Sequence, residues 1–196
     1  MITDKELRES RSVVQRLIKE SLILPADREY QDFFLAKANQ ALETAHLIVK
    51  VSLSPELKSQ LQISSSYVGY MWAINAAYYS MFYAATSLLA KYNHRIKGEQ
   101  GIHVLTYHAL IYYFLDNDKK LSKHILEQYR QAGEEVVELM QIAEQQAREK
   151  IEQVKFELGK RREFTYEMGR IAEKAKAETS LRRAEEFLTL VKELIL

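Results

Sequence analysis

Cysteine is absent from the 196-residue chain, and proline and glycine are scarce, with two and six residues. Without cysteine there are no disulfides, no thiolate metal sites and no cysteine nucleophile. Stability must therefore come from a packed core, and the chain is long enough to form one. The charged start MITDKELRES has no apolar signal segment. We therefore expect a cytoplasmic protein.

Neither sign of charge dominates, because Lys plus Arg total 28 and Asp plus Glu total 27. Global charge therefore does not indicate nucleic-acid binding, and an electrostatic argument must rest on local clusters. The P-loop, Gly-x-Gly-x-x-Gly and Gly-x-Ser-x-Gly motifs are also missing from the sequence. The common nucleotide-binding and hydrolase motifs are thereby excluded.

Helix is predicted along almost the whole chain, because breakers are rare and Ala, Leu, Glu, Lys and Gln are abundant. Thr3 and Glu6 have the spacing of a capping box, Asp27 is a good N-cap, and Ser54-Pro55-Glu56 is a further helix start. Two later stretches carry apolar residues at helical spacing. These stripes are Val136, Met140, Ala143, Ala147, Ile151, Val154, Leu158 and Ala177, Leu181, Ala184, Leu188, Val191, Ile195.

An uncharged run extends from Ser59 to Ala90 and is long enough to raise the question of a membrane span. Polar residues are spread along it, and its apolar content is mainly Ala and Tyr, which do not favour the bilayer centre. The rest of the chain has the pattern of amphipathic helices. The run is therefore predicted to contain a central helix, surrounded on every side by the others.

The predicted fold class is all-α, an up-and-down antiparallel bundle of four to five main helices. We expect a single helical domain over 1–196. Within it, residues 1–24 form an N-terminal helix peripheral to a bundle of about 27–196.

Four segments in order along the chain carry a family resemblance: AAYYSMFYAATSLLA, KGEQG, RREFTY and AEEFLTLVKELI. Together they resemble the HEPN superfamily, in its prokaryotic branch with an Ala-Tyr-Tyr-x-Met-Phe helix, over roughly residues 30–195. The resemblance implies a helical bundle that is commonly a homodimer. Many members accompany a minimal nucleotidyltransferase in a toxin–antitoxin pair, and others are metal-independent ribonucleases.

In the ribonuclease branch an arginine precedes a histidine by a few residues. Histidine can move a proton near neutral pH, and arginine can stabilise charge on phosphate oxygens. Here Arg161 and Tyr166 have that spacing, so tyrosine stands in the histidine position. Glu99 stands where many relatives have a loop histidine, and His103 lies nearby as a substitute.

The predicted site depends on topology. If the helices alternate in direction, the end of the uncharged helix near Lys91 lies beside the end of the long helix near Arg161. A phosphate or nucleotide pocket would then form from side chains of the two segments. Its residues would be Arg161, Arg162, Arg95 and Lys97, with His94 and Tyr166 adjoining and Asn75 and Tyr79 contributed by the central helix.

Simpler readings accompany these assignments. Cations near helix C-termini can merely complement the helix dipole, and Tyr78, Tyr79 and Tyr83 are more readily explained as core. The histidines diverge and no carboxylate pair has ligand spacing, so no metal or other cofactor is expected.

We therefore expect a nucleotide- or RNA-binding module, with a minimal nucleotidyltransferase as the partner that the resemblance implies. The alternatives are a metal-independent endoribonuclease using Arg161 with Tyr166 or His103, and a non-catalytic helical scaffold.

Overall fold

The computed structural model of the chain describes residues 2–97, 101–117, 120–153 and 162–195. At residues 143, 146–153 and 162–172 it describes the backbone alone. The elements follow the chain in this order: α1 Asp4–Lys19, β1 Ile23–Leu24, α2 Arg28–Leu53, α3 Pro55–Gln60, α4 Tyr70–Lys91, β2 Arg95–Ile96, α5 Ile102–Leu110, the π-helix η1 Ile111–Asn117, α6 Lys123–Gln153 and α7 Arg162–Ile195.

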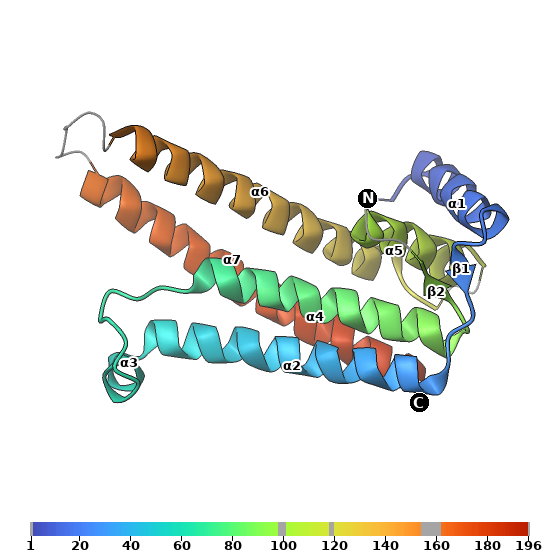
Figure 1. Ribbon diagram of the computed structural model, residues 1–196, viewed down its shortest axis with the longest axis horizontal. Helices are drawn as coiled ribbons and strands as arrows, with labels where there is room; N and C mark the ends of the chain where they lie inside the picture. Colours follow the sequence, from blue (N-terminus) through green and yellow to red (C-terminus); the bar gives the residue numbers. More distant parts are fainter. Residues whose placement is uncertain (1, 98–100, 118–119, 154–161, 196) are drawn as a thin grey trace.

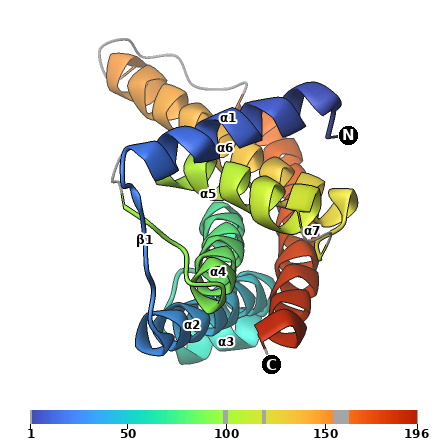
Figure 2. The same cartoon turned by 90° about the vertical axis from the view of Figure 1, so that its right-hand side faces the viewer.

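The long helices α2, α4, α6 and α7 run along the length of the molecule and alternate in direction along the chain (Figure 1). Helix α4 packs most extensively against α2 and α7. Viewed along the bundle, α1 and α5 run crosswise to α4 (Figure 2). The all-α bundle predicted from the sequence is confirmed.

The helix starts follow the predicted capping signals. The Thr3 and Glu6 side chains satisfy each other's backbone N–H groups in a complete capping box. Asp27 accepts from the N–H of Tyr30 at 2.8 Å, and Ser54 accepts from the N–H of Leu57 at 3.2 Å. Local sequence therefore determines where these helices begin.

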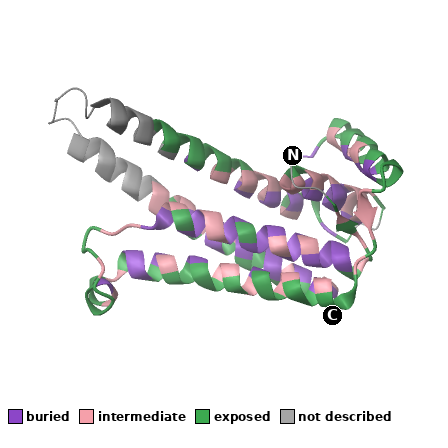
Figure 3. Cartoon of the chain, viewed as in Figure 1, coloured by how far each residue is buried: buried purple, intermediate pink, exposed green. Residues whose placement is uncertain are grey.

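Helix α4 carries much of the core, but the prediction for the uncharged run was only partly right. Residues 61–69 form turns and loop, so the helix begins at Tyr70. One side of α4 is also open, where Trp72 is 56% and Tyr79 is 37% exposed (Figure 3). The helix is not surrounded on every side, because the crosswise α1 and α5 do not cover its full length.

The other two stripes had different outcomes. All six residues predicted for the last helix, from Ala177 to Ile195, are buried. In α6 the buried positions are Leu126, Tyr129, Ala132 and Leu139, whereas Met140 is exposed. At this position the prediction was wrong by one residue, because Leu139 and not Met140 faces the core. Its Ala143, Ala147 and Ile151 lie where only the backbone is described, and Val154 and Leu158 lie outside the described residues.

A short β-bridge fixes the two loops at one end of the bundle. Ile23 pairs with Ile96 and Leu24 with Arg95 in antiparallel register. The N–H of Lys97 extends this pairing by donating to the carbonyl of Leu22 at 2.7 Å. These contacts hold the segment after α4 against the segment before α2.

Among the described residues, no helix is both long and apolar enough to cross a membrane.

Candidate functional site

The two ends that topology was expected to bring together lie apart. The Lys91 Nζ donates to the carbonyl of Ile195 at 2.6 Å, so the end of α4 lies beside the end of α7. Arg162 begins the 34-residue α7, which places it about 50 Å away at ~1.5 Å per residue (Figure 1). The expectation failed because the segment 102–117, a short helix with its π-helical extension, runs across the bundle. The long helix α6 is therefore antiparallel to α4, and the two helices end at opposite ends of the bundle.

Arg161 lies outside the described residues, and the side chains of Arg162 and Tyr166 are not described. Their roles stay predictions. The other predicted residues lie elsewhere on the bundle: Arg95, Lys97, Asn75, Tyr79 and His103. Three of them, Arg95, Tyr79 and His103, lie along one surface.

That surface is a continuous chain of ring contacts across α2, α4 and α5, which we call the aromatic strip. The ring centroids are 4.7 Å apart for Tyr30 and Phe34, 5.8 Å for Phe34 and Tyr83, and 5.7 Å for Tyr83 and Tyr79. The strip ends at His103, whose ring is 5.6 Å from that of Tyr79. Aromatic faces in series offer stacking positions for planar ligands.

Arg95 lies at the other end of the strip. Its guanidinium carbon is 4.9 Å from the ring centroid of Tyr30, within the range of a cation–π interaction. Lys97 follows two residues later and is exposed. Alternate residues of an extended segment share a face, and Ile96 between them packs against the core. Both cations are therefore presented on the outer side.

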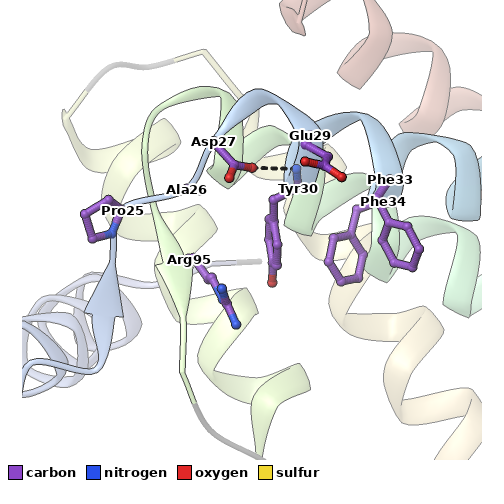
Figure 4. A pocket seen from close by; sticks show the side chains of 8 residues that line it. All are labelled: Pro25, Ala26, Asp27, Glu29, Tyr30, Phe33, Phe34 and Arg95. Atoms are coloured by element: carbon purple, nitrogen blue, oxygen red, sulfur yellow. Dashed lines mark hydrogen bonds between the residues drawn. The ribbon is translucent and has the colours of Figure 1, made fainter.

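A cavity of about 430 Å³ lies at this end of the strip. Figure 4 shows the ring of Tyr30 between Arg95 and the rings of Phe33 and Phe34. Phe33 is 54% exposed, an unusual state for a large aromatic side chain. The volume falls in the range of small-ligand sites.

Local packing fixes the position of Arg95. The Asn93 side-chain oxygen accepts from the N–H of Ala26 at 3.0 Å, which joins the end of α4 to the start of α2. The nearby carboxylate of Asp27 is used as the helix cap of α2. No ion pair of Arg95 with a carboxylate is found within the described ranges, so its guanidinium can meet an external anion.

His94, placed in the basic cluster by sequence, is used in packing instead. Its ring stacks on Tyr113 with centroids 3.9 Å apart. Burial lowers the pKa of His94 below its ordinary value, so the ring is neutral at pH 7. It lines a smaller cavity of about 160 Å³, which shares Tyr30 and Phe34 with the first.

His103 is packed among the rings of Tyr78, Tyr79 and Phe82, at centroid distances of 5.4, 5.6 and 4.2 Å. Burial lowers its pKa as well. Burial raises the pKa of the neighbouring Tyr78 to about 12, so that phenol stays protonated. The structure therefore brings Tyr79 and His103 together, in a partly dry environment.

Asn75 lies one turn before Tyr79 on α4 and is half-buried. Its amide can therefore reach water and does not demand a fixed internal partner. Of the three tyrosines explained as core, only Tyr78 is buried, whereas Tyr83 is half-buried and Tyr79 is exposed.

Tyr30 and Phe33 were missed in the sequence, although a signal was present. The segment Tyr30-Gln31-Asp32-Phe33-Phe34 places aromatic residues one turn apart on a helix.

In the described part of the chain, no three His, Asp or Glu side chains gather in a way that could hold a metal ion. Comparison with protein-family models, with curated proteins and with solved structures yields no match. The HEPN resemblance therefore depends on the sequence motifs alone.

Proposed function

We propose that the chain is a HEPN-like helical protein that binds single-stranded RNA along the aromatic strip. Bases stack on Tyr30 and Tyr79, and on Phe33, whose ring extends the strip at 5.2 Å from that of Phe34. Arg95 and Lys97 contact the phosphates. The observation that carries the proposal is the unbroken series of ring contacts from Tyr30 to His103 with Arg95 at its end. A cationic edge beside stacking rings is the usual arrangement for sequence-tolerant binding of single strands.

Fluorescence anisotropy with a labelled 12-nucleotide RNA tests this proposal. Phe33→Ala should weaken binding roughly tenfold, since one base–aromatic stack contributes about 1–3 kcal/mol. Leu47→Ala is the matched control, because Leu47 is an equally exposed apolar residue of α2 outside the strip. Equal losses in both variants, or no binding at low salt, would contradict the proposal.

Arg95→Ala should lower the affinity and reduce the salt dependence by about one phosphate contact. Arg28→Ala is its control, because Arg28 is exposed, close in sequence to the cavity, and paired with Asp32 at 3.6 Å. A mononucleotide that competes as well as the 12-mer would reduce the proposal to a single-nucleotide site.

Metal-independent RNA cleavage is the second candidate function, and the position of His103 favours it. His103 is neutral at pH 7 and adjoins the strip, so it could accept a proton from a bound RNA hydroxyl. Cleavage that survives a chelator and is lost in His103→Ala and Arg161→Ala would support it. If RNA binds but is not cleaved, the cleavage function is contradicted and only the binding function is supported.

The HEPN proposal also includes a homodimer and a minimal nucleotidyltransferase as partner in a toxin–antitoxin pair. Light scattering can compare the solution mass with the 22.9 kDa of one chain. Co-expression with the product of a neighbouring nucleotidyltransferase gene tests the partner. A monomer that forms no complex with that product would leave a HEPN-like module acting by itself.

A further inference from the structure

A second cavity, of about 560 Å³, lies between α1, α4, α5 and α6. We call it the acidic cavity. His103 contributes to its lining and also ends the aromatic strip, so the two sites adjoin. The volume suits a small molecule. None of the predicted phosphate-binding cations lines it.

Tyrosine rings form the inner wall of the acidic cavity. The rings of Tyr107 and Tyr129 are parallel with centroids 6.3 Å apart, and that of Tyr78 is 6.1 Å from Tyr129. Gly133 makes room for this wall, since a Cβ there would lie 3.3 Å from the Tyr78 ring. Exposed Val104 adds apolar surface at the mouth. The wall therefore suits an apolar or aromatic body.

Carboxylates surround the wall on two sides. Glu6 and Glu9 come from α1, and Glu134 and Glu138 come from α6. The cation in the lining, Arg130, is already paired with Glu127 and with Glu134, the latter at 2.7 Å. Like charges that face each other across an opening repel, and a cation between them relieves the repulsion.

The two histidines in the lining do not offset this charge. Burial lowers the pKa of His103 and of His108, so both rings are neutral at pH 7. His108 is held by Ser10, whose hydroxyl oxygen lies 2.9 Å from the ring Nδ1. Within the described residues, Glu9 forms no ion pair. Glu138 is paired with Lys176 at 3.7 Å, but the four carboxylates of the lining outnumber the two cations Arg130 and Lys176, so the field in the acidic cavity is negative.

Several buried polar atoms in the lining form no hydrogen bond with the part of the chain that the structure describes. Tyr129 is only 2% exposed, and its hydroxyl forms no hydrogen bond with the described residues. Burial raises the pKa of Tyr129, and the neighbouring Tyr78 adds to this effect; the two side chains nevertheless lack the geometry of a hydrogen bond. The Nδ1 of His103 is unpartnered as well. Such groups are rare in proteins and usually meet a ligand or water.

We propose that the acidic cavity binds a small protonated amine that carries an apolar or aromatic body. The ammonium group lies between the carboxylates of α1 and α6, where the tyrosine faces add a cation–π attraction. The body packs against Tyr78 and Tyr107. The hydroxyl of Tyr129 accepts a hydrogen bond from the amine, which removes the cost of leaving it unpaired.

Calorimetric titration with three probes of similar shape tests the charge requirement. Phenethylamine should bind saturably, whereas 2-phenylethanol should bind roughly tenfold more weakly or not at all. Phenylacetate should not bind. Equal binding of all three, or no saturable binding of phenethylamine in the millimolar range, would overturn the proposal.

Two substitutions at Val104 locate the binding. Val104 is 58% exposed, so Val104→Lys and Val104→Glu should both fold, which circular dichroism can verify. Val104→Lys should weaken phenethylamine binding roughly tenfold, and Val104→Glu should preserve or strengthen it. An equal response of the two variants would mean that charge at this mouth does not govern binding, against the proposal.

Tyr129→Phe separates a binding role from a structural one. Removing an unpartnered buried hydroxyl should leave the melting temperature unchanged or raise it, while the affinity for phenethylamine falls severalfold. A loss of stability without a loss of affinity would contradict the assigned role. Phe33→Ala, which tests RNA binding on the aromatic strip, should leave the amine affinity unchanged, so the two proposals can fail separately.

Discussion

The two sides of α4 have similar apolar composition but opposite environments. The side that packs on α2 and α7 carries small or aliphatic residues such as Ala77, Ala84 and Leu88, and all are fully buried. The open side carries Trp72 and Tyr79, which are exposed. Hydrophobicity alone therefore does not decide which side of this helix is covered.

Side-chain size explains the difference. Small residues let the backbones of α2 and α4 approach closely. The hydroxyl of Ser80 donates to the carbonyl of Ala38 at 2.8 Å, and that of Ser87 donates to the carbonyl of Gln31 at 2.9 Å. Large rings do not fit such a seam. Tyr78 and Phe82 pack against His103 of α5 instead, and Trp72 and Tyr79 lie on the open side, where they are available to a ligand.

The largest difference in the loss of stability on substitution is expected between Leu88, on the packed side, and Tyr79, on the open side. Leu88→Ala removes a fully buried side chain and should lower the free energy of unfolding by about 2–5 kcal/mol. Tyr79→Ala should cost less than about 1 kcal/mol in stability but weaken RNA binding. Urea unfolding and RNA anisotropy measure the two effects. Similar stability losses would remove the distinction between the two sides.

A smaller effect is expected from the hydroxyls in the packed seam. Ser80→Ala should cost about 0.5–1.5 kcal/mol, because one buried interhelical hydrogen bond is lost. Thr86→Val is the control, since among the described residues the Thr86 hydroxyl donates to the carbonyl of Phe82 in its own helix, at 2.9 Å, and to no other helix. That variant should be nearly neutral. Thermal unfolding, monitored by circular dichroism, measures both losses. A larger loss for Thr86→Val than for Ser80→Ala would contradict the prediction.

The pH dependence of stability tests whether His103, which lies beside Tyr79 at the open side of α4, is shielded from water. Burial lowers the pKa of His103 from its ordinary 6.5. Well above pH 6.5 the ring is neutral in both the folded and the unfolded state. As the pH falls from 6.5 through the lowered pKa, the unfolded chain takes up a proton that the folded protein resists, so the free energy of unfolding decreases.

His94 and His108 act in the same direction, so removing His103 should only reduce the slope. Urea unfolding at pH 7.5 and 5.5 should show a shallower fall for His103→Gln than for the unsubstituted protein. NMR titration gives the pKa directly. A measured pKa at or above 6.5 would mean that the ring of His103 is accessible to solvent.

The smallest effect is expected at Trp72. This side chain is 56% exposed and lies on the open side of α4, so Trp72→Ser should change the free energy of unfolding by no more than about 0.5 kcal/mol. Its tryptophan fluorescence should also report a largely hydrated ring. A large destabilisation would show that the open side is covered in solution, for example by a second copy of the chain.

Prediction from sequence succeeded where the signal was local. The caps at Thr3, Asp27 and Ser54 specify helix starts because a side chain satisfies a backbone N–H within three residues. The stripe from Ala177 to Ile195 is buried throughout because helical periodicity places those residues on one face. The assignment of RNA binding and of the HEPN family stays a prediction.

Prediction failed where the answer depended on how elements cross. The segment 102–117 has the composition of a bundle helix, yet it runs across the bundle, and this separates the end of α4 from the start of α7. The acidic cavity likewise collects residues from four helices, with Glu6 and Tyr129 far apart in sequence. No spacing rule connects such positions.

The amino-acid sequence by itself determined that the chain is helical, where many helices begin, and which face of the last helix is buried, since these follow from contacts within a few residues. Tertiary structure alone decided that one side of α4 is open, that Arg95 lies over Tyr30, and that carboxylates of α1 and α6 line one cavity. Those arrangements arise from the packing of whole helices, where side-chain size and crossing direction decide which distant residues meet.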